Sequence, residues 1–242
     1  MQFLLSILVL LVFAFIWYRP LVNRQQACGG YITKKEFRKA VFYGLIPGAI
    51  LLLLIEVGVG YVIKFLGLND GGLLNIFLDA FIMYALVEEL VKYFCAAQVI
   101  KGKESLKRID IMVVFASVGL GYEVIETLFM GNLIASISRG IFVAHMAYQL
   151  IMAYFYCESL KAKSLGDEKK AKNMKILTFV VPIVIHGIND FCCKLIGFEG
   201  LGIDETLLTI ICVLGLFLLQ LICLIVGLKF AKIEPDSELS LN

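Results

Sequence analysis

Long apolar segments are the feature that most constrains the fold of this chain. They lie near residues 2–18, 40–66, 75–100, 110–131, 134–159, 175–197 and 205–230. Each is long enough to cross the roughly 30 Å hydrocarbon core of a bilayer as a helix. The segments lack the alternation of a membrane β-barrel, and any other spanning segment must satisfy its own backbone hydrogen bonds. The sequence therefore predicts an all-α, polytopic membrane helix bundle with about seven transmembrane helices.

The distribution of charge supports this fold class and predicts its orientation. Charged residues make up 17% of the 242 residues and hydrophobic residues 60%, against about 25% and 50% in soluble domains. Most of the 22 Lys and Arg residues lie in alternate connections, at 19–39, 101–108, 161–175 and after 228. The positive-inside rule then predicts an N-terminus outside and a C-terminus in the cytoplasm. No basic patch interleaves with aromatic residues, so nucleic-acid binding is not expected.

We interpret residues 1–242 as a single integral-membrane domain. The first segment has no positive charge before it, so it is expected to be a retained helix and not a signal peptide. Residues 75–197 are predicted to form a four-helix catalytic core, and residues 1–74 and 198–242 to supply flanking helices.

Charged and polar side chains within the apolar segments are the second unusual feature. A charge at the centre of a membrane helix costs about 2.5–3.5 kcal/mol on insertion scales. The polar residues at this depth are Glu56, Glu88, Glu89, Lys92, Glu123, Glu126, Arg139, His145, Gln149, His186, Asn189 and Asp190. Since residues of this kind usually mark functional sites in membranes, the set predicts a site between the helices.

The two histidines of the chain, His145 and His186, both belong to this set. With Glu88 they lie about eleven to thirteen residues from the outer ends of their predicted helices, so the three side chains are nearly level. Two histidines and a carboxylate can hold a catalytic zinc ion, and a further carboxylate can act as general base. Lys92 can pair with Glu88 or Glu89, which precede it by four and three residues. Asp190 follows His186 by four residues and could orient its ring or act as a ligand.

Four motifs occur in a fixed order: EELVK at 88–92, GYEVIE at 121–126, an Arg–His pair at 139 and 145, and HGIND at 186–190. This set resembles the PrsW family of bacterial intramembrane proteases, with its E-E-x-x-K, G-F-x-x-x-E-N and H-G-x-x-D motifs and a histidine in a later helix. It is more remotely similar to the CAAX prenyl endopeptidase and bacteriocin-immunity superfamily. The resemblance covers residues 80–191.

The chain departs from these motifs in one helix. Tyr122 stands for the usual Phe, Thr127 replaces the usual Asn, and Glu123 is an additional acid. The resemblance implies cleavage of a membrane-anchored anti-sigma factor on the outer side of the bacterial cytoplasmic membrane, early in a stress response.

The leading hypothesis is an intramembrane metal-dependent endopeptidase with a single-pass membrane protein as substrate. The predicted zinc ligands are Glu126, His145 and His186. The predicted catalytic residues are Glu88 or Glu89 as base, Lys92 to orient or neutralise that pair, and Asp190 beside His186. Glu56 and Glu123 are expected to be structural or to line the cavity.

Three alternatives stay open at this stage. A metal-free mechanism could use glutamate and histidine to activate water. A proton- or ion-coupled transporter could use the Glu/His/Asp cluster as a relay. A non-catalytic sensor or immunity protein could retain the residues without catalysis.

Overall fold

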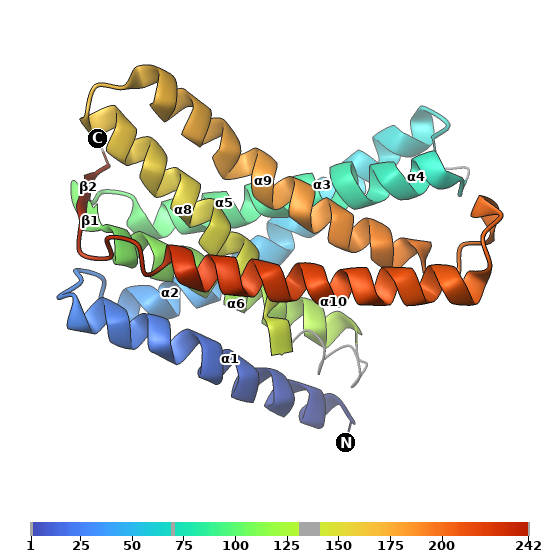
Figure 1. Cartoon of the computed structure of the whole chain (residues 1–242), viewed down its shortest axis with the longest axis horizontal. Coiled ribbons are helices and arrows are strands. Elements are labelled where there is room, and N and C mark those ends of the chain that lie inside the picture. Colours follow the sequence, from blue (N-terminus) through green and yellow to red (C-terminus); the bar gives the residue numbers. More distant parts are fainter. Residues whose placement is uncertain (1, 69–70, 131–140, 242) are drawn as a thin grey trace.

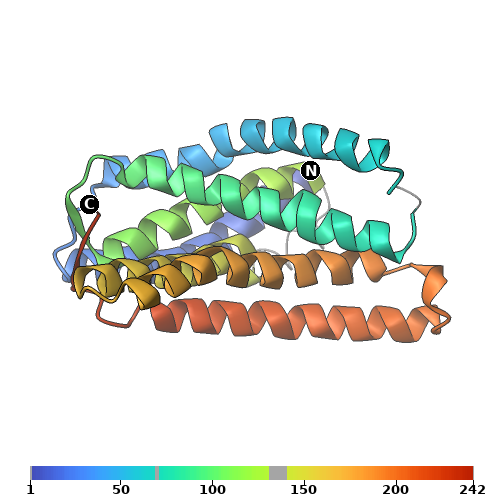
Figure 2. The ribbon, with the colours of Figure 1, turned by 90° about the horizontal axis from the view of Figure 1, so that it is seen from above.

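The computed structural model describes residues 2–68, 71–130 and 141–241, most of which are helical. The longer helices are α1 (Gln2–Ala27), α2 (Lys34–Leu45), α3 (Pro47–Phe65), α5 (Val87–Ile100), α6 (Arg108–Met130), α8 (Ala144–Ser164), α9 (Glu168–Leu195) and α10 (Glu205–Phe230). The short elements are α4 (Leu73–Leu78), the π-helix η1 (Asp79–Leu86), β1 (Ser105–Lys107), the 3-10 helix η2 (Glu199–Leu201) and β2 (Glu238–Ser240). The helices form an elongated bundle along one axis (Figure 1 and Figure 2), and the all-α prediction is confirmed.

Three helical segments of the described chain are long and apolar enough to cross a membrane: Lys34–Phe65, Glu168–Leu195 and Glu205–Phe230. Large apolar side chains cover their outer surfaces, as at Leu54 on α3, which is 67% exposed. Such a surface is suited to lipid. The predicted count of seven spanning helices and the predicted orientation of the termini go beyond this finding.

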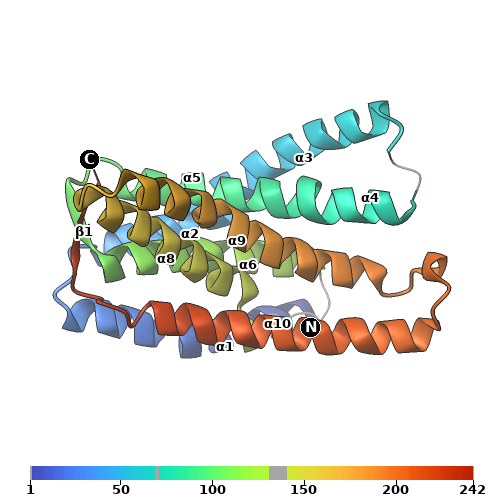
Figure 3. The same ribbon diagram turned by 45° about the horizontal axis from the view of Figure 1, so that its top comes forward.

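The apolar segment predicted at 40–66 is divided into two helices at Pro47. α2 ends at Leu45, and Pro47 takes the first position of α3, where its missing N–H leaves no hydrogen bond unmade. α3 then leans away from α4, α5 and the rest of the bundle (Figure 3). The break therefore leaves room between α3 and the helices that carry the histidines.

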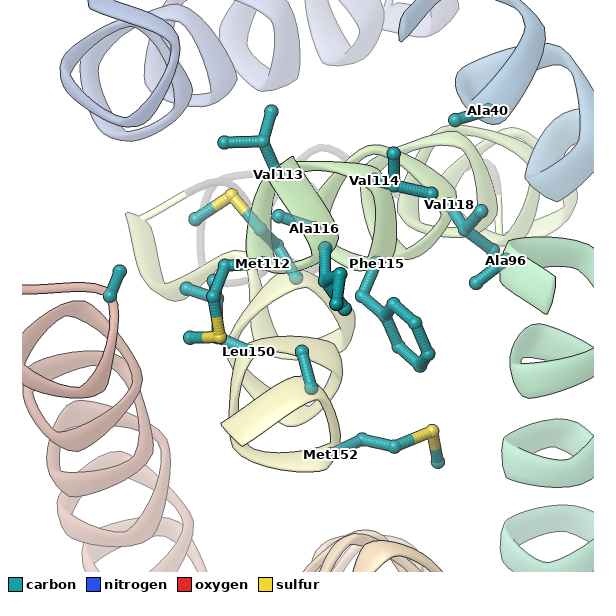
Figure 4. Close-up of a cluster of buried hydrophobic side chains, with 14 of the residues drawn as sticks. Ala40, Ala96, Met112, Val113, Val114, Phe115, Ala116, Val118, Leu150 and Met152 are labelled. Atoms are coloured by element: carbon teal, nitrogen blue, oxygen red, sulfur yellow. The ribbon is translucent and has the colours of Figure 1, made fainter. Parts of the chain in front are cut away.

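Helix α6 forms the centre of the molecule. It packs against α1, α2, α5 and α8, and its residues 111–116 are fully buried. Figure 4 shows Val113, Val114 and Phe115 of this helix pointing outward to different neighbours. A helix that is apolar on every side is stable only when it is surrounded in this way.

A glycine sets the close approach of α6 to α8. A Cβ atom added to Gly119 would lie 2.5 Å from the carbonyl oxygen of His145. Because that contact is with backbone, a side chain at this position would push the two helices apart. Gly119 thus fixes the backbone of one of the two histidines against the core.

The charged connections gather at one end of the bundle. Lys103 pairs with Glu36 at 2.5 Å, and Lys161 pairs with Glu234 at 2.6 Å. The chain after α10 returns to the same end, where β2 pairs with β1 in antiparallel register (Figure 1). The connections that the sequence predicts on one side of the membrane therefore lie together.

Candidate functional site

A cavity of about 1070 Å³ lies between the helices and is lined by residues from α2, α3, η1, α5, α6, α8, α9 and α10. Most of its wall is apolar. Its titratable lining residues include Glu56, Glu88, Glu126, His145, His186 and Asp190. Except for Glu89 and Glu123, the carboxylates and imidazoles predicted at bilayer depth thus line one cavity.

The E-E-x-x-K residues begin the helix that follows the π-helical segment. η1 leads directly into α5, which starts at Val87, and π-helical turns are often found at functional sites. Lys92 is fully buried, and its Nζ donates to Glu88 Oε2 at 3.0 Å and to Glu89 Oε1 at 2.8 Å. One ammonium group therefore pairs with both neighbouring carboxylates.

The two glutamates occupy different environments. Glu88 lines the cavity, whereas Glu89 does not and is fully buried. Besides Lys92, Glu89 Oε1 contacts His186 Nδ1 at 2.9 Å, and its Oε2 accepts from Gln149 Nε2 at 2.8 Å. Both oxygens of Glu89 are engaged by protein groups, so Glu88 is the member of the pair that faces the open space.

His186 lies between three carboxylates. Its Nδ1 faces Glu89, while its Nε2 is 3.4 Å from Asp190 Oδ2 and 3.8 Å from Glu88 Oε2. A carboxylate on one ring nitrogen fixes the orientation of the imidazole and directs the other nitrogen toward a possible ligand. Here Glu89 fixes the ring, and Nε2 points to the cavity side of the cluster.

His145 lies at the start of α8, where the backbone is strained. Val143 precedes the helix with φ 40° and ψ 57°, a left-handed conformation that is unfavourable for a β-branched residue. The buried carboxylate of Glu123 accepts the backbone N–H of His145 at 2.9 Å, in the manner of a helix N-cap. Glu123 therefore has the structural role that the sequence suggested.

Both ring nitrogens of His145 have partners. Lys92 Nζ lies 2.8 Å from Nδ1, and the carboxylate of Glu126 contacts Nε2. The two histidine rings are 5.1 Å apart between centroids. His145 thus connects the E-E-x-x-K residues of α5 to the acidic end of α6.

Glu88, His145 and His186 each offer one ligand atom, and these atoms lie within 4.8 Å of one another. All three side chains are buried, and two imidazoles with a carboxylate form a donor set that suits zinc and other transition metals. The cluster also carries more carboxylates than Lys92 alone can balance, which a divalent cation would offset. The residues therefore fit a metal centre.

The family model described as PrsW family intramembrane metalloprotease matches residues 36–222. The chain belongs to the PrsW family. It is 34% identical over 137 residues to the protease PrsW of Oceanobacillus iheyensis, and this match covers 52% of the chain and 58% of that relative. No solved structure matches significantly. Together with the three candidate spans, membership of PrsW makes the chain a multi-pass membrane protein.

Most residues of the PrsW motifs are brought together by the fold. Glu88, Glu89, Lys92, His145 and His186 are joined by direct contacts, as described above. Glu126 and Asp190 each contact one histidine. Arg139 lies outside the described residues. Glu56 lines the cavity, as expected.

The sequence did not assign roles to several polar residues around the site. Gln149 was recognised as intramembrane, and its i,i+4 relation to His145 could have placed it beside the same site. Tyr122 lies with its ring under Lys92, at 4.3 Å from Nζ to the centroid, and Tyr148 packs against His186. Gln220 of α10 also lines the cavity, and a single amide in so apolar a helix was a usable signal.

Proposed function

We propose that this chain is an intramembrane metal-dependent endopeptidase that cleaves a membrane-anchored protein. The observation that carries the proposal is the buried Glu88–His145–His186 cluster at the wall of a large cavity between apolar helices. A cavity of this size has room for a segment of peptide beside the cluster. Membership of the PrsW family gives the same reaction class.

We assign the metal ligands to Glu88, His145 and His186. For His145 to bind a metal, its ring would have to give up one of its two protein partners, Lys92 at Nδ1 or Glu126 at Nε2. The prediction from sequence had Glu126 as the third ligand and Glu88 or Glu89 as the base. The revised assignment is supported by the 4.8 Å grouping, which contains Glu88 with both histidines. When bound, a zinc ion would acidify a water molecule and polarise the carbonyl of the scissile peptide.

In this assignment Glu126 is the general base. Its side chain is 29% exposed, lines the cavity and contacts His145. It would take a proton from the attacking water and return it to the leaving amine. Glu89 would orient His186, and Lys92 would neutralise the carboxylate pair on α5. Asp190 would stabilise the outer side of His186.

We further propose seven spanning helices with the N-terminus outside, the C-terminus cytoplasmic, and cleavage toward the outer side. His186 lies nearer Leu195 than Glu168 in α9, and the charged connections gather at the Glu168 end of that helix. Residues 75–197 would form the catalytic core of the single domain, with cavity walls added by α3 and α10. An anti-sigma-factor-like protein is the substrate that the PrsW resemblance implies.

Two isosteric variants test the assignment, with a tagged single-pass candidate substrate and purified protein in detergent. Glu88→Gln is expected to lose bound metal and cleavage together. Glu126→Gln is expected to retain metal and lose cleavage. Glu234→Gln, on the exposed connection after α10, is the matched control. If Glu126→Gln loses the bound metal and Glu88→Gln retains it, the ligand set predicted from sequence, with Glu126 as the third ligand, is correct.

Metal dependence itself has a separate test. A chelator should abolish cleavage, and zinc should restore it. Cleavage by metal-free protein would support the glutamate mechanism instead. Cleavage that persists in Glu88→Gln, Glu126→Gln and His186→Ala would overturn the enzyme assignment, and ion flux in liposomes without cleavage would favour the transporter.

A further inference from the structure

Helix α10 carries one polar side chain at the level of the site. Between Thr209 and Lys229, Gln220 is the only residue with an amide, hydroxyl or charged group. It is half-buried and lines the cavity. An amide in an apolar environment is costly unless it is hydrogen-bonded. Its partner should therefore reveal why it is there.

Two hydrogen bonds and an ion-pair contact lead from Gln220 to His186. Gln220 Nε2 donates to Asn189 Oδ1 at 2.7 Å. Asn189 Nδ2 donates to Asp190 Oδ1 at 3.2 Å. The other carboxylate oxygen of Asp190 lies 3.4 Å from His186 Nε2. The four residues connect α10 to the nitrogen of His186 that faces the cavity.

We propose that Gln220 is a positioning residue of the metal centre, acting through Asn189 on Asp190 and His186. The inference rests on the proposed function, because it concerns the geometry of the proposed ligand His186. It also extends the site beyond residues 75–197, since α10 was expected only to flank the catalytic core.

The physical reason lies in the direction of the two amides. The Asn189 side chain has one acceptor and one donor end. Because Gln220 donates to the acceptor end, the donor end of Asn189 is turned toward Asp190. Without Gln220, the Asn189 amide is held by a single 3.2 Å bond to its neighbour and can turn into the cavity that it lines. Asp190 then loses the partner that holds its carboxylate beside His186.

Two substitutions of Gln220 separate this role from simple packing. Gln220→Leu keeps the volume and removes the donor. Gln220→Glu keeps the shape, but an ionised carboxylate cannot donate to Asn189 Oδ1. Both are expected to weaken zinc binding about 10-fold, the lower end of the range for residues that orient metal ligands. The control is Leu214→Ala on the same helix, because Leu214 is 64% exposed to the outside.

A double-mutant cycle provides the deciding measurement. Zinc affinity is measured by competition with a chromophoric chelator for wild type, Gln220→Leu, Asn189→Leu and the double variant. If the bond to Asn189 carries the effect, Gln220→Leu should cause no further loss in the Asn189→Leu background. Unchanged affinity in Gln220→Leu, or an equal loss in both backgrounds, would overturn the proposal.

The same double-mutant cycle can be measured by thermal unfolding of the four proteins in detergent without metal. This measurement does not depend on the proposed function. Coupling between Gln220 and Asn189 should appear as non-additive changes in Tm. Additive changes in Tm would contradict the positioning role of Gln220 even if the wild type binds no metal. A wild type that shows this coupling but binds no metal would instead contradict the metalloprotease assignment.

Discussion

Replacing Glu89 with glutamine gives the sharpest test of how the site is built. Glu89 is fully buried and accepts hydrogen bonds from Lys92 and Gln149 while it contacts Nδ1 of His186. Glutamine has the same shape, but an NH₂ donor group replaces one of the two acceptor oxygens of the carboxylate. Its oxygen can face Lys92 and His186, which leaves its NH₂ group opposite the NH₂ group of Gln149. The Gln149 amide can resolve this by turning over, because its Oε1 has no hydrogen-bond partner among the described residues.

The variant is therefore expected to lose stability because a charge is removed, and not because hydrogen bonds are lost. A hydrogen bond to a charged group contributes about 1.5–3 kcal/mol, and a neutral one about 0.5–1.5 kcal/mol. Weakening the bonds to Lys92 and His186 should lower the free energy of unfolding by about 1–3 kcal/mol. Removing the side chain altogether, in Glu89→Ala, leaves buried donors unpaired and should cost about 3–5 kcal/mol.

Function should respond more strongly than stability. Loss of the carboxylate that orients His186 is expected to weaken metal binding about 10–100-fold. The assay is zinc competition on purified protein, with thermal unfolding in detergent measured in parallel. Gln149→Leu removes another partner of Glu89 without touching His186, so its effect on zinc affinity should be smaller. Wild-type zinc affinity in Glu89→Gln would refute the orienting role of Glu89.

Three further predictions concern Gly187, Lys92 and Leu239. Gly187→Ala would place a Cβ atom 2.3 Å from the ring of Phe81, so it should cost about 1–3 kcal/mol and weaken zinc binding. Phe81→Leu in the same chain should restore both stability and zinc affinity. Gly215→Ala, where a Cβ atom meets open space, should change neither quantity. Lys92→Met should lower stability by about 3–5 kcal/mol in chelator. Added zinc should reduce that loss in thermal unfolding, because the ion replaces the missing charge, whereas equal losses with and without zinc would contradict this reasoning. Leu239→Ala removes a buried side chain opposite Leu106. It should lower the free energy of unfolding by about 2–5 kcal/mol and leave zinc affinity unchanged.

The hydrophobic pattern predicted helices because it depends on local sequence, but several bounds differ: α9 begins at Glu168, before the segment predicted at 175–197. The start of the segment predicted at 134–159 lies outside the described residues. The break at Pro47 follows from the chemistry of proline, and the segment predicted at 205–230 has the same limits as α10. The segment predicted at 75–100 is helical, but η1 within it has π-helical hydrogen bonds. This segment packs against α9, where Phe81 closely approaches Gly187, and no local sequence pattern specifies its change of register.

The sequence predicted which polar residues lie at one level but could not determine which side chains face one another. Depth along a helix can be counted, so Glu88, His145 and His186 were predicted to be level. Rotation about the helix axis depends on tertiary packing, and only the structure separates cavity-facing Glu88 from buried Glu89. The link from Gln220 to Asp190 depends on the side-by-side packing of α9 and α10, which spacing along the chain does not express.

The balance of charge within the site favours a cation-binding role over a structural ion pair. A structural pair in a membrane helix would need only Lys92 and one carboxylate to be neutral. Here Glu88, Glu89, Glu126 and Asp190 surround the two histidines and a single lysine in the described part of the chain. Buried charge without compensation costs several kcal/mol per ion. Additional carboxylates would therefore destabilise the bundle unless a divalent cation, or protons held on the histidines, balanced them. Zinc competition at several pH values distinguishes the two, since zinc that must displace those protons binds more tightly as the pH rises.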